Sequence, residues 1–231
     1  MNIGGYQKLT LIDYPGKIAT TIFTVGCSFR CPFCHNPELV LGKKVSGGKK
    51  LEDEFFKFLK SRIGKLEGVC ITGGEPTIQK DLVEFIQKIK KLGFFVKLDS
   101  NGTRPDVLKK LLDLKLLDFI AMDIKNQLKK YDLTTGVKGD AERIKLSVKL
   151  IMNSRLPYEF RTTVVPGIHV EKDFSEIANW IGGAKSYYLQ EYREQVILDP
   201  KLKKKTKGKK IDLEKILQKI KKSFKQAGIR R

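Results

Sequence analysis

Three of the four cysteines of this 231-residue chain lie in one short segment, TVGCSFRCPFCHNP, from Thr24 to Pro37. Their spacing, C-x3-C-x2-C, brings Cys27, Cys31 and Cys34 onto one loop. Thiolates are soft ligands that favour iron–sulfur clusters, zinc or Cu(I). A four-iron cluster needs four ligands, so three cysteines leave one iron open to a ligand that is not protein. The segment therefore predicts an open iron–sulfur site that could carry out chemistry.

Zinc is the alternative metal for these cysteines. A closed structural zinc site takes four ligands, usually two C-x2-C pairs or one pair and two histidines, and the sequence has no second pair. His35 could complete the set only as a strained fourth ligand beside Cys34, and a ring packed against the loop is the simpler interpretation. Cys70 lies in the apolar segment EGVCITG, so we expect it to pack in the core.

Short apolar strands alternate with amphipathic helices around this segment. A β-branched strand at 17–26 leads directly into the cysteine loop, and a helix at 51–62 follows. The same unit then repeats, with strands at 68–72, 94–98, 118–122, 158–164 and 186–190 and helices at 81–92, 106–114, 141–153 and 174–181. This alternation predicts an α/β fold with right-handed crossovers and a parallel sheet. The sheet could be a partial barrel or an open doubly wound sheet.

Two motifs resemble those of the radical S-adenosylmethionine (SAM) superfamily. These are the cysteine spacing, with Phe33 before the third cysteine, and the later sequence GGEP at 73–76. The words IDYPGK, CHNP, DSNGT, MDIK and RTTVVPG are similar to activating enzymes of glycyl-radical enzymes, including activators of anaerobic ribonucleotide reductase. The resemblance extends from about Gly4 to about Tyr192. It implies a TIM-like partial (β/α)6 barrel of parallel strands in residues 1–199.

The resemblance also implies a [4Fe-4S] cluster and a SAM site. The glycines of GGEP allow close backbone approach, and its carboxylate can bind the SAM ammonium. An arginine within the apolar strand at 158–164 needs a partner if it is buried, and the SAM carboxylate or Glu75 could supply it. The cluster ligands are expected to be Cys27, Cys31 and Cys34. The residues expected to bind the cofactors are Phe33, His35, Gly73, Gly74, Glu75, Pro76, Ser100, Asn101, Asp123, Lys125, Arg161 and Thr163.

Two further expectations follow from the resemblance. The activators place a monovalent cation among acidic residues near SAM, and Asp13, Asp99 and Asp123 match those positions. Activators of the pyruvate formate-lyase type carry a histidine after strand six, where this chain has QEYREQ, and His169 lies elsewhere. The sequence therefore fits the reductase-activator branch better.

The activity that the resemblance implies is reductive cleavage of SAM to methionine and a 5'-deoxyadenosyl radical. That radical would generate a glycyl radical on a partner enzyme, for which we favour anaerobic ribonucleotide reductase. Flavodoxin or ferredoxin would supply the electron. The alternatives are a radical SAM enzyme acting on a nucleobase, a small heterocycle or RNA, and a non-enzymatic, zinc-stabilised basic RNA-binding module.

The composition limits the location and partners of the protein. No run of eighteen apolar residues and no apolar N-terminal signal segment is present, so we expect a cytoplasmic protein with no membrane partner. The clustered cysteines suit a reducing compartment. A net charge of +20 could attract nucleic acid or acidic partners. We favour a lysine-rich surface over nucleic-acid binding, because no arginine-rich stripe or base-stacking module is present.

Residues 200–231 differ in composition from the rest of the chain. The run KLKKKTKGKK is expected to be a solvated linker, with binding to an acidic partner or nucleic acid as the alternative. An amphipathic helix ending near Gly228 is expected to follow and to close the exposed edge of the barrel. Its apolar face would consist of Ile211, Leu213, Ile216, Leu217 and Ile220.

Overall fold

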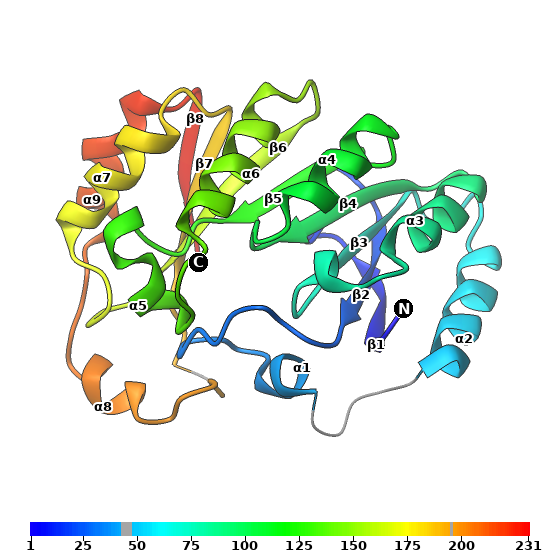
Figure 1. Cartoon of the computed structure of the whole chain (residues 1–231), viewed down its shortest axis with the longest axis horizontal. Coiled ribbons are helices and arrows are strands. Elements are labelled where there is room, and N and C mark those ends of the chain that lie inside the picture. The colour runs from blue at the N-terminus through cyan, green and yellow to red at the C-terminus, as the bar shows by residue number, and fades with distance from the viewer. Residues whose placement is uncertain (43–47, 195) are drawn as a thin grey trace.

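In residues 1–42, 48–194 and 196–231, the part of the chain that this computed structural model describes, eight strands form one sheet (Figure 1). They lie in the sheet in chain order. Their bounds are β1 (Ile3–Thr10), β2 (Ala19–Thr24), β3 (Gly68–Gly73), β4 (Phe95–Ser100), β5 (Phe119–Asp123), β6 (Tyr158–Val164), β7 (Ser186–Glu191) and β8 (Gln226–Arg230).

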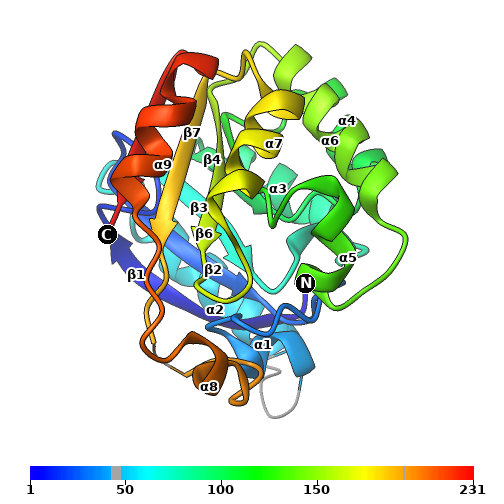
Figure 2. The ribbon, with the colours of Figure 1, turned by 90° about the vertical axis from the view of Figure 1, so that its left-hand side faces the viewer.

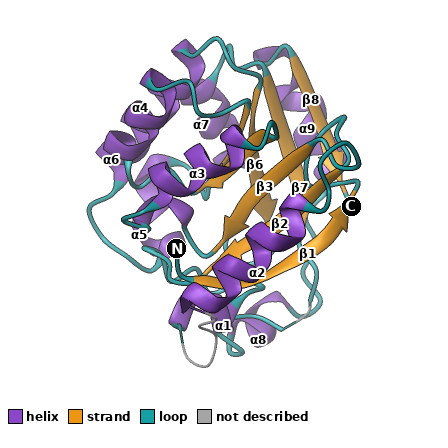
Figure 3. Cartoon of the chain, turned by 90° about the vertical axis from the view of Figure 1, so that its right-hand side faces the viewer, coloured by secondary structure: helices purple, strands orange, loops and turns teal. Residues whose placement is uncertain are grey.

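The sheet is an open, largely parallel barrel. Strands β2 to β8 each run parallel to their neighbours, whereas β1 forms an antiparallel hairpin with β2. The edges are β1 and β8, and no pairing within the described ranges joins them (Figure 3). The structure confirms the predicted partial barrel of parallel strands.

The longer helices cover the outer face of the curved sheet, and short helices lie toward one end of it (Figures 1 and 3). They are α1 (Pro37–Leu41), α2 (Gly48–Lys60), α3 (Leu82–Lys91), α4 (Pro105–Asp113), α5 (Tyr131–Thr135), α6 (Ala141–Asn153), α7 (Glu171–Ile181), α8 (Leu202–Thr206) and α9 (Leu213–Ile220). Three 3-10 turns also occur in the described chain: η1 (Pro76–Ile78), η2 (Leu128–Lys130) and η3 (Lys221–Ser223). No helix in this part of the chain is both long and apolar enough to cross a membrane.

Alternation along the strands separates an apolar outer face from a polar inner face. On β4, Val96 and Leu98 are fully buried in the apolar core. Lys97 and Asp99 alternate with them and therefore point to the opposite, concave face. The fold consequently gathers polar side chains inside the barrel, near the carboxyl ends of the strands.

Neither edge strand is predicted from the sequence. β1 has the sequence IGGYQKLT, in which Ile3 and Thr10 are buried and the residues between them are partly or fully exposed. With two glycines and little apolar alternation, this segment lacks the usual strand pattern. It pairs because it folds back on β2 as a hairpin.

The C-terminal helix is shorter than predicted. We expected it to end near Gly228, but α9 ends at Ile220 and the chain continues through η3 into β8. Ile220 and Phe224 are four residues apart, a spacing that fits one more helical turn, so the periodicity does not mark the end of the helix. In the structure the Phe224 ring packs against Tyr187, with centroids 4.8 Å apart. Helix α9 contacts β7 and β8 (Figure 2), so β8 and not the helix forms the barrel edge.

The lysine run is not simply a solvated linker. It contains α8, which Leu202 and Thr206 anchor as buried residues while its lysines are exposed. The predicted apolar face of the last helix does pack against the core, with Ile216 and Ile220 buried and Ile211, Leu213 and Leu217 partly buried.

Strand β8 also brings a buried ion pair into the barrel. Arg230 donates two hydrogen bonds, of 2.7 and 2.6 Å, to the Glu159 carboxylate, which is 3% exposed. We expect Arg230→Leu to lower the free energy of unfolding by about 2 kcal/mol, because it leaves a buried carboxylate without its main partner. The melting temperature should fall by about 4–8 °C in circular dichroism. Adding Glu159→Gln should recover much of this loss, and an unchanged single variant would contradict the prediction.

Candidate active site

The cysteine loop, residues 27–34, connects β2 to α1 at the carboxyl end of the barrel. Gly26 has a φ of 95°, which favours glycine, and turns the chain out of β2. Its N–H donates to Leu39 O at 2.8 Å, and the Arg30 N–H donates to Thr135 O at 2.8 Å. All three loop cysteines line one pocket. Backbone bonds to two other segments therefore hold the loop with its thiols around a shared space.

The environment of the thiols fits a cationic metal group. Burial raises the pKa of Cys27 to about 11 and that of Cys31 to about 12, so both thiols retain their protons near neutral pH. The Cys27 Sγ nevertheless has two donors, the Phe29 N–H at 3.4 Å and Asn101 Nδ2 at 3.7 Å. The Lys125 ammonium lowers the pKa of both thiols against the effect of burial. An iron–sulfur cluster would supply the positive charge that these sulfurs need in order to ionise.

The GGEP turn packs directly against the start of the cysteine loop. Gly74 donates its N–H to Thr24 O at 2.8 Å, and a Cβ at Gly74 would lie 1.9 Å from Gly26 O. Gly73 has a φ of 113°, and a Cβ there would meet the Thr24 backbone at 2.4 Å. Any side chain at either glycine would push the two motifs apart.

Glu75 connects the GGEP turn to the turn after β4. Its carboxylate is 1% exposed and accepts from Thr77 N–H at 3.0 Å, Thr77 Oγ1 at 2.5 Å, Ser100 Oγ at 2.8 Å and Asn101 N–H at 2.6 Å. Burial raises the pKa of Glu75. The residue lines the pocket, but its hydrogen bonds go to protein groups. Pro76, which follows Glu75 in the chain, is buried at the first position of η1.

Asn101 in turn connects the turn after β4 to the cysteine loop. Its Nδ2 donates to Ser28 Oγ at 2.9 Å, and its Oδ1 accepts from Thr103 N–H at 3.0 Å. The hydroxyls of Ser28 and Thr103 are 2.8 Å apart. The sequence interpretation assigned no role to Ser28 or Thr103, although Ser28 lies in the cysteine segment and Thr103 ends the word DSNGT, because their hydroxyls meet only in the folded structure.

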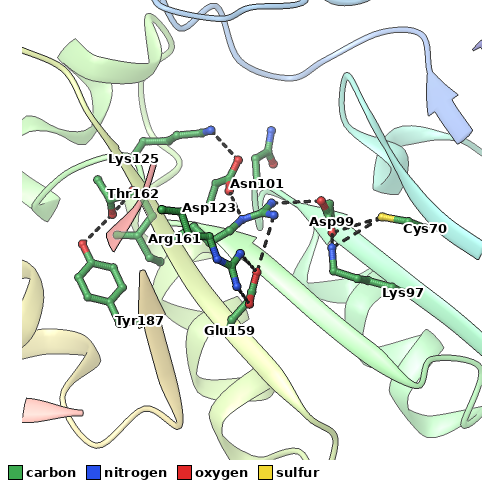
Figure 4. Close-up of polar contacts among 12 residues, drawn as sticks. Cys70, Lys97, Asp99, Asn101, Asp123, Lys125, Glu159, Arg161, Thr162 and Tyr187 are labelled. Carbon is green, nitrogen blue, oxygen red and sulfur yellow. Dashed lines mark hydrogen bonds and ion pairs between the residues drawn. The ribbon is translucent and has the colours of Figure 1, made fainter. Parts of the chain in front are cut away.

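A charged network crosses the pocket floor (Figure 4). Arg161 on β6 donates from Nε to Asp123 at 3.1 Å and from a terminal nitrogen to Asp99 at 3.2 Å. Lys125 Nζ donates to the other Asp123 oxygen at 2.9 Å. Burial alone would raise the pKa of Asp123, but the charges of Lys125 and Arg161 outweigh it and hold that pKa well below its usual range. The partners of Arg161 are therefore Asp99, Asp123 and, at 3.8 Å, Glu159, and not Glu75 as the sequence suggested.

Behind this network lies a lysine that the sequence interpretation missed. Lys97 is 1% exposed, forms an ion pair with Asp99 and has its Nζ 3.6 Å from Cys70 Sγ (Figure 4). Cys70 is fully buried, as expected, but its sulfur contacts these polar groups. A single lysine within the apolar strand was the available signal. Its charge is compensated by an acid two residues along the same strand, on the same face.

The acids proposed for a monovalent cation have other partners in this structure. Asp99 and Asp123 are ion-paired with Arg161, and Asp13 accepts from Thr21 Oγ1 at 2.5 Å. Across residues 1–42, 48–194 and 196–231, no three thiol, imidazole or carboxylate residues are arranged to hold a single metal ion. A cluster does not need three ligands around one ion, because each cysteine binds a different iron. The cation remains a prediction.

His35 packs beside the segment that follows β7. Its Nε2–H donates to Arg193 O at 2.9 Å, and its ring stacks on Tyr192 with centroids 5.9 Å apart. This segment is the one that lacks the histidine of the formate-lyase-type activators; its last residue, Gln195, lies outside the described residues. The ring is thus packed against the neighbouring chain, as the simpler interpretation predicted, although it also lines the pocket.

The pocket at the barrel mouth brings most of the predicted residues together. Its lining includes Cys27, Cys31, Phe33, Cys34, His35, Gly73, Gly74, Glu75, Ser100, Asn101, Asp123, Lys125, Arg161 and Thr163, and also Asp99. Pro76 and Asp13 are not part of this lining.

His169, which had no assigned role, supports Lys125 from outside the pocket. It is 2% exposed; its Nδ1 accepts from Val165 N–H at 3.0 Å, and its Nε2–H donates to Lys125 O at 2.8 Å. The sequence VPGIH after a predicted strand was the available signal. Both ring nitrogens are used by the backbone, so this histidine fixes the position of the chain at Lys125.

Protonation of His169 should destabilise the fold. Burial lowers the pKa of His169 below its ordinary 6.5. Between the folded and unfolded pKa values, this residue is therefore protonated in the unfolded chain and neutral in the folded chain. Stability should therefore fall as the pH drops below about 6.5, by at most about 1.4 kcal/mol per pH unit. We expect His169→Gln, whose amide can still donate to Lys125 O, to flatten the melting temperature profile between about pH 5 and 7. A variant profile as steep as that of the parent would contradict this.

An open parallel barrel with three clustered cysteines and a charged pocket at its carboxyl end defines a class of cluster-binding enzymes. The chain belongs to the radical SAM superfamily, whose family model matches residues 21–181. Membership identifies the chain as an enzyme and rules out the zinc-stabilised RNA-binding module. The cofactors that this family implies are a [4Fe-4S] cluster and SAM, which the pocket chemistry described above fits.

Relatives of known name agree with this membership. A Methanocaldococcus jannaschii protein that carries the provisional name of a glycyl-radical enzyme activating enzyme is 35% identical over 209 residues, covering 87% of this chain and 84% of that protein. The pyruvate formate-lyase-activating enzyme of Listeria monocytogenes is 38% identical over 140 residues, which is 56% of each chain.

Solved structures show the same fold. SuiB of Streptococcus suis, in a structure bound to SAM, superimposes with a TM-score of 0.65 at 16% identity. That match covers 87% of this chain and 48% of SuiB. Coproporphyrinogen III oxidase of Escherichia coli gives a TM-score of 0.61 at 13% identity, covering 92% of this chain and 54% of that one. The chain thus spans about half the length of these solved relatives.

Proposed function

We propose that this enzyme is a radical SAM activase that generates a glycyl radical on a partner enzyme. The observation that carries the proposal is the 35% identity with the M. jannaschii relative, because it extends over 84% of a protein with that provisional name. The motif words CHNP, DSNGT and MDIK, which resemble those of activators, all fall at the pocket. We also propose a cytoplasmic location, since the cluster cysteines must stay reduced.

Different residues of the pocket would bind the cluster and SAM. Cys27, Cys31 and Cys34 would ligate three irons and leave one open. When bound, the cluster and SAM supply the one-electron cleavage of a carbon–sulfur bond. Asp123 is 32% exposed, and it could bind an ammonium, while Lys125 beside it could bind a carboxylate. Glu75 already accepts four protein hydrogen bonds, so we assign it the positioning of the turns and not direct binding of SAM.

The remaining predicted residues would shape the site. Ser100 and Asn101 would present the turn after β4 to the ribose hydroxyls, and Arg161 would hold Asp123 in place through its 3.1 Å bond. Phe33 is buried beside the cysteines and would exclude water from them. A pocket with fixed charges stabilises an ionic ligand without having to reorganise.

For the partner we propose anaerobic ribonucleotide reductase. This preference depends on the segment after β7, which carries Tyr192, Arg193 and Glu194 and no histidine. The similarity to the Listeria pyruvate formate-lyase-activating enzyme supports a different glycyl-radical partner, so both partner classes belong in the test.

The test is to reduce the reconstituted enzyme and incubate it with SAM and each glycyl-radical enzyme of the same organism. We expect an electron paramagnetic resonance doublet on the partner, and it should collapse to a singlet when the partner's glycine is α-deuterated. A Cys34→Ala enzyme serves as the blank. Cleavage of SAM without a radical on any partner would refute the proposed activation.

One observation favours a second candidate. A Pyrococcus horikoshii protein with the provisional name of a GTP 3',8-cyclase is 30% identical over 163 residues, covering 69% of this chain and 51% of that protein. A nucleotide or other heterocycle would then be the substrate. The same incubation with GTP, analysed by mass spectrometry for a new nucleotide product, distinguishes the two.

A further inference from the structure

The segment 197–206 lies directly against the cysteine loop. Leu198 donates its N–H to Cys34 O at 3.0 Å, and Asp199 donates its N–H to Pro32 O at 3.0 Å. Helix α8 begins three residues later, and the Leu202 N–H donates back to Asp199 O at 3.0 Å. Three residues span at most roughly 11 Å. The first turn of α8 is therefore within that distance of the loop that carries the cluster ligands.

Helix α8 exposes an unusual concentration of positive charge. Leu202 and Thr206 are buried, while the lysines between and before them are exposed: Lys201, Lys203, Lys204 and Lys205. None of these four forms an ion pair with an acid in the described ranges. Asp199 is the acid nearest in sequence, and it caps the Lys201 N–H at 3.0 Å.

Some lysines elsewhere are neutralised, and others are not. Lys17, Lys88, Lys90 and Lys109 pair with acids on their own or neighbouring elements. Just beyond α8, Lys207, Lys209 and Lys210 share a groove with Glu191 and Glu194. The four lysines of the α8 segment all lie within residues 201–205, at the same end of the molecule as α1 and the cysteine loop (Figures 1 and 2).

We propose that α8, through Lys201, Lys203, Lys204 and Lys205, is the docking surface for an acidic one-electron carrier protein that reduces the cluster. The proposal builds on the proposed function, because SAM cleavage consumes one electron per turnover. In each encounter the carrier is oxidised by one electron and the cysteine-held cluster is reduced by one. No proton and no further reactant is needed.

The physical demands of such an encounter match this surface. Electron-transfer complexes are small and short-lived, so long-range attraction between opposite charges governs their formation more than buried apolar area does. The four lysines, which have no ion-pair partner among the described residues, offer that attraction. The backbone hydrogen bonds at Leu198 and Asp199 place them beside the loop that holds the electron acceptor. A nucleic acid would also be attracted by the charge, but it has no need for proximity to the cysteines.

The test compares two triple variants with the same change in net charge. Lys203→Glu, Lys204→Glu and Lys205→Glu alter α8; Lys91→Glu, Lys110→Glu and Lys149→Glu alter exposed lysines on α3, α4 and α6, on the outer face of the sheet. The probe is an acidic plant-type ferredoxin, and its dissociation constant is measured by calorimetry with the reconstituted protein at about 50 and 300 mM salt. We expect the α8 variant to weaken binding at least tenfold at low salt, the control variant to change it less than threefold, and high salt to remove the difference.

A kinetic measurement separates this proposal from the proposed function. Cluster reduction is followed by visible absorbance, with either reduced ferredoxin or dithionite as donor. We expect the α8 variant to slow reduction by ferredoxin at least tenfold and to leave reduction by dithionite and subsequent SAM cleavage unchanged. Equal weakening of ferredoxin binding by both variants would overturn the docking surface. So would an α8 variant that loses binding to a duplex RNA and not to ferredoxin. Absence of SAM cleavage with dithionite in the parent would instead refute the proposed function.

Discussion

Replacing Cys34 with serine will leave the reconstituted protein without its cluster and without SAM cleavage, whereas Cys70→Ser will retain both. The pocket offers three thiols from one loop, and a serine oxygen is a much harder ligand for iron than a thiolate. Cys70 is on β3 beneath the pocket floor, with its sulfur 3.6 Å from Lys97 Nζ. Iron and sulfide analysis after anaerobic reconstitution, together with assay of 5'-deoxyadenosine, measures the effect.

The two variants are a matched pair in that each replaces one cysteine sulfur with oxygen, although Cys34 is partly exposed and Cys70 is buried. Circular dichroism should show that both remain folded. Iron content near four per chain is expected for Cys70→Ser and near zero for Cys34→Ser. Loss of iron in Cys70→Ser alone would mean that the site is closed by four cysteines and has no open iron.

Asp123→Asn should weaken SAM binding by about 30-fold or more. The Asp123 carboxylate pairs with Lys125 and Arg161 and is the proposed acceptor for the SAM ammonium, so an amide in its place removes that acceptor and leaves the two cations short of a counterion. Removing one partner of such a group costs about 2–5 kcal/mol, and we take the lower end because Asp123 is 32% exposed. About 2 kcal/mol corresponds to a 30-fold change in affinity.

The control for this prediction lies just before the start of the same strand, at the opposite end from Asp123. Asp118 precedes β5 and forms an ion pair with Lys90 at 2.7 Å, remote from the pocket lining. Asp118→Asn should lower the melting temperature slightly and leave SAM affinity unchanged. Titration calorimetry with SAM and thermal unfolding measure both variants. Equal SAM affinity in Asp123→Asn and the parent would remove this carboxylate from the binding site.

The barrel was predictable because its signals are local. Each parallel strand is a short apolar run followed by a turn and an amphipathic helix, so strands β2 to β7 can be located from the sequence. β8 could not be, because QAGIR is a weak strand pattern that follows a continuing helical period. It is a strand because Phe224 packs on Tyr187 and Arg230 binds Glu159, contacts between residues far apart in the chain.

The site also contains residues that local sequence signals identify and residues whose roles depend on long-range contacts. The cysteines and the glycines of GGEP were found through residue type and spacing. The role of Glu75 could not be found in this way, because a carboxylate after two glycines could either bind an ammonium group or hold two turns together. Its four hydrogen bonds come from two turns that only the folded barrel brings together. His169 and Lys97 were missed because their roles depend on the folded sheet: His169 Nε2 binds the Lys125 carbonyl on another turn, and Lys97 pairs with Asp99 inside the barrel.

The hydrogen bonds around the cysteine loop bear on how the metal enters. Backbone hydrogen bonds to other segments hold four residues in and next to the loop, namely Gly26, Arg30, Pro32 and Cys34. None of these hydrogen bonds involves a thiol. The entropy of ordering the loop is therefore lost when the polypeptide folds, not when iron arrives. Many small metal sites are disordered until the ion binds and unfold when it leaves. Here a chain stripped of iron by oxygen should keep its shape, so that damage to the cluster can be repaired by reinsertion without refolding.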